Sequence, residues 1–178
     1  MERPTHHLRN LLSDAATAGR GIAVISALAL ATVLTAQYGF GLKPCELCHF
    51  QRVPYVAALF LGLLVLLLAK KGKPKVAAAL VFLCALIFAA GSGLGFYHAG
   101  VEQHWWRSFL EGCKIDFSSG GDLLAQIEAS AAVPCDRPAW VDPVIGMSMA
   151  AWNGIVSAGL AVGCMTSSIL ITRRANGF

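Results

Sequence analysis

Four long apolar stretches dominate the sequence, and short polar segments separate them. They cover residues 21–40, 53–69, 76–97 and 144–171. A helix rises about 1.5 Å per residue and the hydrocarbon core of a bilayer is about 30 Å thick, so about 20 apolar residues span it. Each stretch is therefore long enough to cross a membrane, provided that the second one borrows flanking residues.

The stretches are uniformly apolar and lack the alternation of membrane β-barrel strands. An unpaired backbone group inside a bilayer costs several kcal/mol, so an apolar span without that alternation is expected to be a helix. The sequence therefore predicts an all-α membrane protein. A single domain over residues 1–178 would form a four-transmembrane-helix bundle with two outer loops, at about 41–52 and 98–143.

Basic residues cluster on one side of the predicted bundle. Arginines precede the first stretch, four lysines occupy the loop 70–75, and Arg173 and Arg174 follow the fourth stretch. The positive-inside rule assigns that side to the cytoplasm. We therefore expect a multi-pass protein of the bacterial inner membrane, with both termini cytoplasmic and both longer loops periplasmic.

Composition agrees with a membrane location. Hydrophobic residues make up 56% of the chain and charged residues only 13%, far from the average of soluble proteins. The formal net charge of +4 is compatible with nucleic-acid binding, but the basic residues flank apolar stretches, where they act as topology signals. We therefore expect membrane lipid, and no nucleic acid, as a partner.

Four of the six cysteines lie in the predicted outer loops. Cys45 and Cys48 belong to the first loop, and Cys113 and Cys135 belong to the second. Thiols in an oxidising compartment are expected to pair. The simplest pairing joins Cys45 to Cys48 and Cys113 to Cys135.

The two pairs have different implications. Taken alone, a Cys113–Cys135 disulfide is a staple that closes a loop of about twenty residues, worth about 3 kcal/mol. The loop closed by Cys45 and Cys48 is too short to constrain much of the unfolded chain, whereas C-x-x-C spacing lowers thiol pKa values and suits thiol–disulfide exchange. The first pair is therefore predicted to be redox-active.

A zinc site is the alternative for the C-x-x-C pair, with His49, His98 or His104 as a further ligand. It lacks a second closely spaced ligand pair, so we predict no metal. The remaining cysteines, Cys84 and Cys164, lie within the third and fourth stretches. They are most simply small packing residues.

Arg52 follows Cys48 by four residues. If the second membrane helix begins near Cys48, the guanidinium shares a helix face with the thiol, and both this charge and the helix N-terminus favour a thiolate. The alternative is that Arg52 marks the membrane boundary and extends into the headgroups. Pro54 restrains Val53 away from helical geometry and so predicts a delayed helix start.

At these residues the chain resembles the DsbB family of membrane thiol oxidases. The resemblance rests on four helices, on Pro44-Cys45-Glu46-Leu47-Cys48 followed by Arg52, and on a cysteine pair between the third and fourth helices. It implies a thiol:quinone oxidoreductase that forms protein disulfides. Its partner would be a soluble, periplasmic, thioredoxin-like oxidase of the DsbA type, and its acceptor a membrane quinone, ubiquinone or menaquinone.

The resemblance also implies a role for each outer cysteine. The partner's thiolate would attack Cys113 and release Cys135, which would then attack Cys45. Cys48 would face the quinone.

Three further positions take their implied roles from the resemblance. Arg52 would stabilise the reduced quinone, and His98 matches a family histidine near the quinone. On general grounds His98 is equally compatible with an ordinary interfacial histidine. Some relatives carry glutamine four residues after that histidine, where this chain has Glu102.

Two other interpretations use the same features. A quinone-linked oxidoreductase of the vitamin K epoxide reductase type has similar parts, but its C-x-x-C pair follows the loop cysteines, whereas here Cys45 and Cys48 come first. A non-enzymatic membrane scaffold stapled by two structural disulfides is the alternative from a different class. In either case, the amphipathic spacing in the second outer loop predicts a short interfacial helix over 122–132.

Overall fold

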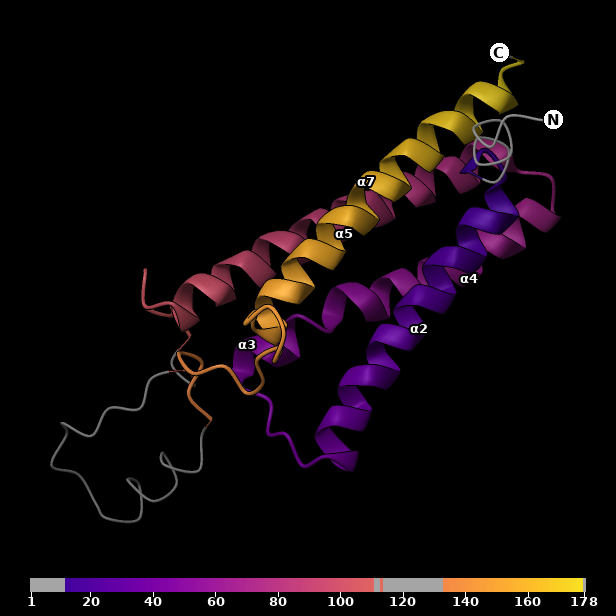
Figure 1. Cartoon of the computed structure of the whole chain (residues 1–178). Coiled ribbons are helices and arrows are strands. Elements are labelled where there is room, and N and C mark those ends of the chain that lie inside the picture. Colours follow the sequence, from indigo (N-terminus) through magenta and orange to yellow (C-terminus); the bar gives the residue numbers. More distant parts are fainter. Residues whose placement is uncertain (1–11, 111–112, 114–132, 178) are drawn as a thin grey trace, which may run out of the picture.

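The computed structural model describes residues 12–110, 113 and 133–177 (Figure 1). Its helices are α2 (Ala15–Gly39), α3 (Glu46–Phe50), α4 (Val53–Lys70), α5 (Pro74–Glu102) and α7 (Met149–Ala175). Four helical spans are long and apolar enough to cross a membrane, with α3 and α4 together forming the second. This confirms the predicted all-α class. The interfacial helix predicted over 122–132 lies outside the described residues.

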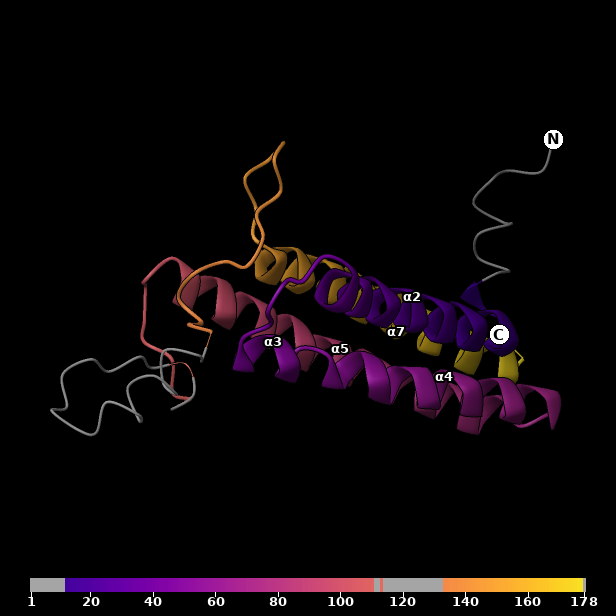
Figure 2. The same cartoon turned by 90° about the horizontal axis from the view of Figure 1, so that it is seen from below.

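The long helices pack in the order α2, α4, α5, α7. The closest pairings are α5 with α7 and α2 with α4, and α4 joins α5. Figure 2 shows α4 and α5 in one layer and α2 and α7 in the other. The buried centre of the bundle contains Tyr55 and Phe88, whose rings meet edge to face at 5.7 Å, together with the isolated cysteines Cys84 and Cys164.

Glycines set the distance between paired helices. A Cβ added at Gly95 of α5 would lie 2.6 Å from the backbone nitrogen of Gly154 in α7, and one added at Gly62 of α4 would lie 2.9 Å from the backbone nitrogen of Ala23 in α2. Such close approach is possible only without a side chain at these positions, as is common between membrane helices.

The helix ends correct three of the predicted bounds. The first helix begins at Ala15 rather than 21, because the Asp14 carboxylate accepts a hydrogen bond from the Thr17 backbone N–H at 2.8 Å and caps it. The fourth begins at Met149 rather than 144. The Asp142 carboxylate accepts hydrogen bonds from the backbone N–H groups of Val144 and Ile145 and holds them in a turn. Ser148 then supplies the N-cap of the helix.

The third helix also differs from the predicted bounds. It continues to Glu102, whereas the apolar stretch ends at 97 and the second outer loop was predicted to begin at His98. His98 and Glu102 are therefore helical residues, and both are buried.

The two ends of the bundle differ in chemistry. The start of α2, the loop between α4 and α5 and the end of α7 lie at one end, together with the basic clusters (Figure 1). The segment that carries Cys45 and Cys48 lies at the other end, with Cys113 and Cys135. The four outer-loop cysteines thus share one end of the bundle.

Candidate redox site

A break in the second membrane span positions the C-x-x-C pair. Cys45 caps the short helix α3, and its sulfur accepts a hydrogen bond from the Cys48 backbone N–H at 3.4 Å. The helix ends at Phe50, and α4 begins at Val53 with Arg52 as its N-cap. Cys48 and Arg52 therefore belong to two successive helices of one span rather than to one continuous helix, but both line the same cavity, so the predicted proximity of guanidinium and thiol is confirmed.

The start of the long helix after Cys48 agrees with the delay predicted from Pro54, but the predicted non-helical geometry of Val53 is wrong. Val53 is the first residue of α4, and Pro54 lies in its first turn. Proline is tolerated there because the first backbone N–H groups of a helix have no partner within the helix.

Cys45 and Cys48 are free thiols whose sulfurs lie 3.0 Å apart, so the structure shows this pair reduced rather than as the predicted disulfide. Cys45 is buried, whereas Cys48 is partly exposed. The hydrogen bond with Cys48, together with burial, raises the pKa of the Cys45 thiol above its ordinary 9.0. A group with a raised pKa holds its proton, so Cys45 needs a nearby base before it can react as a thiolate.

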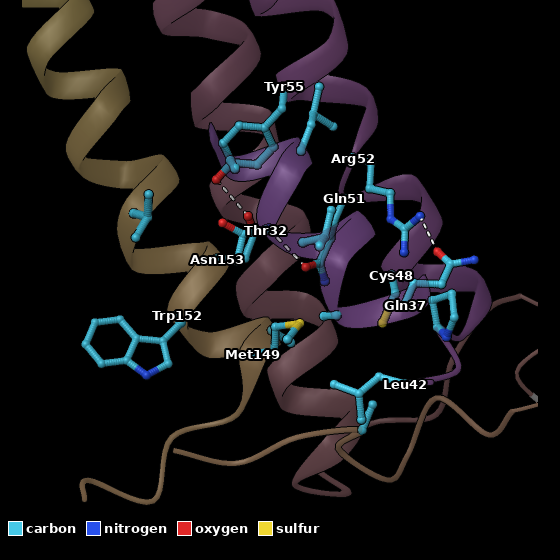
Figure 3. A pocket seen from close by; sticks show the side chains of 18 of the residues that line it. Thr32, Gln37, Leu42, Cys48, Gln51, Arg52, Tyr55, Met149, Trp152 and Asn153 are labelled. Atoms are coloured by element: carbon cyan, nitrogen blue, oxygen red, sulfur yellow. Dashed lines mark hydrogen bonds between the residues drawn. The ribbon is translucent and has the colours of Figure 1, made fainter. Parts of the chain in front are cut away.

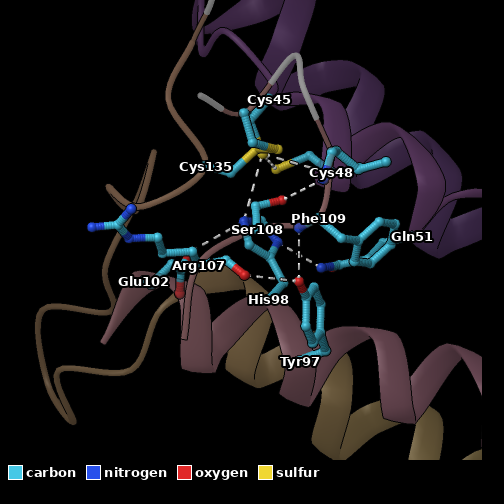
Figure 4. The surroundings of a disulfide bond; sticks show 12 residues. Cys45, Cys48, Gln51, Tyr97, His98, Glu102, Arg107, Ser108, Phe109 and Cys135 are labelled. Carbon is cyan, nitrogen blue, oxygen red and sulfur yellow. Dashed lines mark hydrogen bonds and ion pairs between the residues drawn. A yellow bond between two sulfur atoms is a disulfide. The ribbon is translucent and has the colours of Figure 1, made fainter. Parts of the chain in front are cut away.

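Cys113 and Cys135 form a disulfide, as the sequence predicted, and it lies against the C-x-x-C pair. Cys45, Leu47, Val101, Cys113 and Cys135 make one buried apolar cluster, with Cys135 fully inaccessible. In Figure 4 the sulfurs of Cys135 and Cys48 both point toward Cys45. The fold thus brings together cysteines from two loops that are distant in sequence.

His98 contacts the pair from α5. Its Nε2 lies 3.5 Å from the Cys45 sulfur, and its Nδ1 lies 2.7 Å from the Gln51 side-chain nitrogen. The ligand atoms of Cys45, Cys48 and His98 lie within 4.8 Å of one another, a spacing that would also suit a metal ion. Of the other histidines considered for zinc, His104 lies elsewhere, 3.8 Å from Asp136.

Cys48 lines a mostly apolar cavity of about 280 Å³ between α2, the C-x-x-C segment and α7 (Figure 3). Small and apolar side chains form most of the wall; they include Ala29, Leu30, Val33, Ala36, Met149, Ala150 and Val156. Polar side chains contribute a minor part of the wall surface; they include Gln37, Gln51, Arg52, Tyr55, Glu102 and Asn153. A concave apolar site with a few placed polar groups is typical of small-molecule binding.

Arg52 is the cation beside Cys48 in this cavity. One guanidinium nitrogen donates a hydrogen bond to the Gln37 side-chain oxygen at 2.8 Å. Its Nε is buried and has no hydrogen-bond partner among the described residues. A buried donor without a partner is costly, so Arg52 is prepared to bind an acceptor atom in the cavity.

Glu102 places a carboxyl group on the same wall. One oxygen lies 3.9 Å from His98 Nε2, and the other is buried without a hydrogen-bond partner in the described part of the chain. No role could be assigned to this residue from the sequence, and the structure puts it within the site.

Sequence reasoning missed four polar side chains at the site: Gln37, Gln51, Tyr55 and Asn153. Asn153 donates to Gln51 at 3.0 Å and accepts from the Tyr55 hydroxyl at 2.8 Å. The available signal was their position, because amide side chains next to or within apolar spans are uncommon and often functional.

Comparisons with known proteins agree with this geometry. Residues 17–166 match the family model for disulfide bond formation protein DsbB. The chain is 27% identical over 154 residues to disulfide bond formation protein B of Xanthomonas axonopodis pv. citri (strain 306), covering 81% of this chain and 84% of that one. It is 26% identical over 149 residues to the protein of that name from Stutzerimonas stutzeri (strain A1501), covering 79% and 86%.

No solved structure gives a significant match. The family match covers most of the chain, including all four membrane spans at least in part and all six cysteines. The chain therefore belongs to the DsbB family of disulfide bond formation proteins.

Proposed function

We propose that this protein is a thiol:quinone oxidoreductase. It reoxidises a periplasmic, thioredoxin-like oxidase of the DsbA type and passes the electrons to a membrane quinone, ubiquinone or menaquinone. Membership of the DsbB family supports the disulfide-forming activity. The observation that carries the rest is the contact between the Cys113–Cys135 disulfide and Cys45, together with Cys48 on the wall of an apolar cavity.

The thiol chemistry follows the order of these contacts. A thiolate of the soluble oxidase attacks Cys113, the bond to Cys135 breaks, and Cys135 leaves with the electron pair as a thiolate. Cys135 then attacks Cys45 in the Cys45–Cys48 disulfide, and Cys48 leaves as the new thiolate. The partner's second thiolate then attacks its bond to Cys113, and the freed Cys113 thiolate attacks Cys135 and releases Cys45. Each exchange forms one S–S bond and breaks another, so the partner dithiol becomes a disulfide and two electrons reach the Cys45–Cys48 pair beside the cavity.

The cavity residues fit a quinone. A bound quinone accepts two electrons and two protons, which matches the oxidation of a dithiol. Arg52 would hold a carbonyl oxygen, because its buried Nε has no partner, and the apolar side chains of α2 and α7 would surround the ring. The assignment of His98 to the quinone remains a prediction. Gln51, which lines the cavity, links it to the imidazole.

The charge distribution supports the proposed orientation. Arg20, the lysines of the loop between α4 and α5, Arg173 and Arg174 lie at the end of the bundle opposite the cysteines. By the positive-inside rule, this supports cytoplasmic termini and periplasmic cysteines. This side is where a soluble oxidase would reach Cys113.

Replacement of Cys48 tests electron delivery. Purified protein is mixed with a short-chain quinone and a reduced thioredoxin-like oxidase, and quinone absorbance is followed. We expect Cys48→Ser to abolish quinone reduction and the matched variant Cys164→Ala, in the buried helix core, to retain it. Quinone reduction at the wild-type rate in Cys48→Ser would falsify the proposal.

A trapping experiment tests where electrons enter. Cys135→Ala leaves Cys113 as a free thiol, and its thiolate should attack the disulfide of an oxidised partner, forming a mixed disulfide and releasing one partner thiolate. Non-reducing electrophoresis should show this adduct, and Cys113→Ala should not form it. Equal amounts of adduct in both variants would exclude Cys113 as the attachment site.

The same variants separate the alternatives. In a scaffold with two structural disulfides, no outer cysteine would affect quinone absorbance. An enzyme of the vitamin K epoxide reductase type would require the order of cysteine pairs to be reversed, and here the pair on the cavity wall comes first in the chain.

A further inference from the structure

A line of hydrogen bonds runs from the membrane core to the Cys45 sulfur. The Tyr55 hydroxyl donates to the Asn153 oxygen at 2.8 Å, and the Asn153 nitrogen donates to the Gln51 oxygen at 3.0 Å (Figure 3). The Gln51 nitrogen lies 2.7 Å from His98 Nδ1, and His98 Nε2 lies 3.5 Å from the sulfur (Figure 4).

The order of donors and acceptors along this line determines the tautomer of His98. When the Gln51 nitrogen donates to Nδ1, neutral His98 carries its proton on Nε2 and directs it at the Cys45 sulfur. Rotation of both amide groups by a half-turn reverses every bond. Nδ1–H then donates to the Gln51 oxygen, and Nε2 presents a lone pair to Cys45.

The far end of the line can support either direction. The Tyr55 hydroxyl lies 3.0 Å from the Ser157 hydroxyl, and either oxygen is able to donate. In the reversed direction the Asn153 nitrogen donates to Tyr55, and Tyr55 donates to Ser157. Tyr55 and Ser157 are buried, so the direction is set by the protein groups rather than by bulk water.

We propose that Gln51 and Asn153 are positioning residues that set the protonation state of His98 Nε2 and thereby allow it to take the proton from Cys45. This inference rests on the proposed function, because Cys45 must lose its proton before it can rejoin Cys48 in a disulfide. In this step the S–H bond of Cys45 breaks, an N–H bond forms at Nε2, and the electron pair stays on sulfur. The resulting imidazolium donates from Nδ1 to the Gln51 oxygen.

The surroundings of His98 favour this assignment. Among the described residues, the titratable groups that face it are Cys45 and, beyond it, Cys48 from the C-x-x-C segment, and Glu102 from α5 itself. The backbone of Cys135 is a further hydrogen-bond partner of the ring. The helix α7 contributes the neutral Asn153 through Gln51. The high pKa of Cys45 explains why this thiol needs a base.

Two substitutions fix the direction of the line and one interrupts it. A carboxylate only accepts hydrogen bonds, so Gln51→Glu and Asn153→Asp each favour the state with the proton on Nδ1 and the lone pair of Nε2 toward Cys45. Asn153→Leu removes the middle of the line with little change in volume. Matched controls are Gln103→Glu at the end of α5 and Asn176→Leu at the other end of α7.

The experiment uses the full-length reduced protein and needs neither quinone nor partner. Nitrogen-15 chemical shifts of the His98 ring, assigned with His98→Gln, report the tautomer. Mass spectrometry reports the alkylation rate of Cys45 as a function of pH. We expect Asn153→Leu to slow Cys45 alkylation at neutral pH by about tenfold, and Gln51→Glu to move its profile down by about one pH unit.

The inference is overturned if the ring shifts and the Cys45 profile in Gln51→Glu and Asn153→Asp match those of the controls. Should Asn153→Leu fail to fold, these two polar variants carry the test. Failure of the proposed function looks different, because wild-type protein would then leave quinone absorbance unchanged whatever the state of His98.

Discussion

The contact between Gly95 and Gly154 ties helix packing to the redox site. A Cβ at Gly95 would lie 2.6 Å from the Gly154 nitrogen and 2.7 Å from its Cα, whereas ordinary contact begins at 3.4 Å. Both atoms belong to the backbone and cannot rotate away. In Gly95→Ala, α5 and α7 must therefore separate by about 0.8 Å, the difference between contact and the present distance.

Asn153 precedes Gly154 and moves with it. A shift of α7 by that amount directed along the 3.0 Å bond between Asn153 and Gln51 would lengthen the bond to at most about 3.8 Å, beyond hydrogen-bonding distance. We expect Gly95→Ala to lose about 1–3 kcal/mol of stability, the usual effect of overpacking. Loss of the hydrogen bond between the Asn153 and Gln51 side chains should also slow quinone reduction by about tenfold.

Gly93→Ala is the matched control, because a Cβ at Gly93 meets nothing within 4 Å. Both variants are compared with wild type by thermal unfolding in detergent and by quinone absorbance. The reasoning is refuted if Gly95→Ala unfolds at the same temperature as Gly93→Ala and reduces quinone at the same rate.

Three other changes have defined outcomes. Arg52→Lys should raise KM for quinone more than it lowers kcat, because lysine lacks the planar donors that reach both Gln37 and the cavity; an unchanged KM would contradict this. The alkylation rate of Cys45 should keep rising above pH 9.0, because the hydrogen bond with Cys48 raises the pKa of the Cys45 thiol. Cys48→Ala removes this hydrogen bond and should move the midpoint of the pH–rate profile down. A wild-type midpoint at pH 9.0 would contradict this. Asp14→Ala should lower stability by about 1 kcal/mol in unfolding measurements at neutral pH. A hydrogen bond from the Thr17 hydroxyl lowers the pKa of Asp14. The stabilising effect of Asp14 is therefore present above its ordinary pKa of 3.8 and is lost as the pH falls through the lowered value. A difference in stability between wild type and Asp14→Ala that persists in stronger acid would count against the cap.

Hydropathy was sufficient to predict four spans, but not where the third one ends. A hydropathy window detects residues that face lipid or an apolar core, and at His98 the sequence becomes polar. The helix continues because these polar residues contact the C-x-x-C segment rather than water, and His98 is 2% exposed. The fall in hydropathy at His98 thus marks the point where the helix leaves apolar surroundings, and the helix itself ends later, at Glu102.

The candidate site was predictable only where chemistry is encoded locally. The spacing of Cys45 and Cys48 identifies a redox pair within four residues of sequence, and the resemblance supplied their partners. The bond between Asn153 and Gln51 joins positions 102 residues apart, so no local pattern contains it. Such contacts depend on how α5 and α7 pack, which the glycine spacing determines.

The cavity wall also determines how an electron acceptor arrives. Its sides come from α2 and α7, which pack mainly on α4 and α5 rather than on each other. Both helices are long and apolar enough to span a membrane, so an opening between them would face the bilayer. Under the proposed function, a lipid-soluble acceptor would then arrive by lateral diffusion without crossing water. Turnover should then depend on the mole fraction of acceptor in the surrounding lipid, and diluting the vesicles in buffer should leave it unchanged.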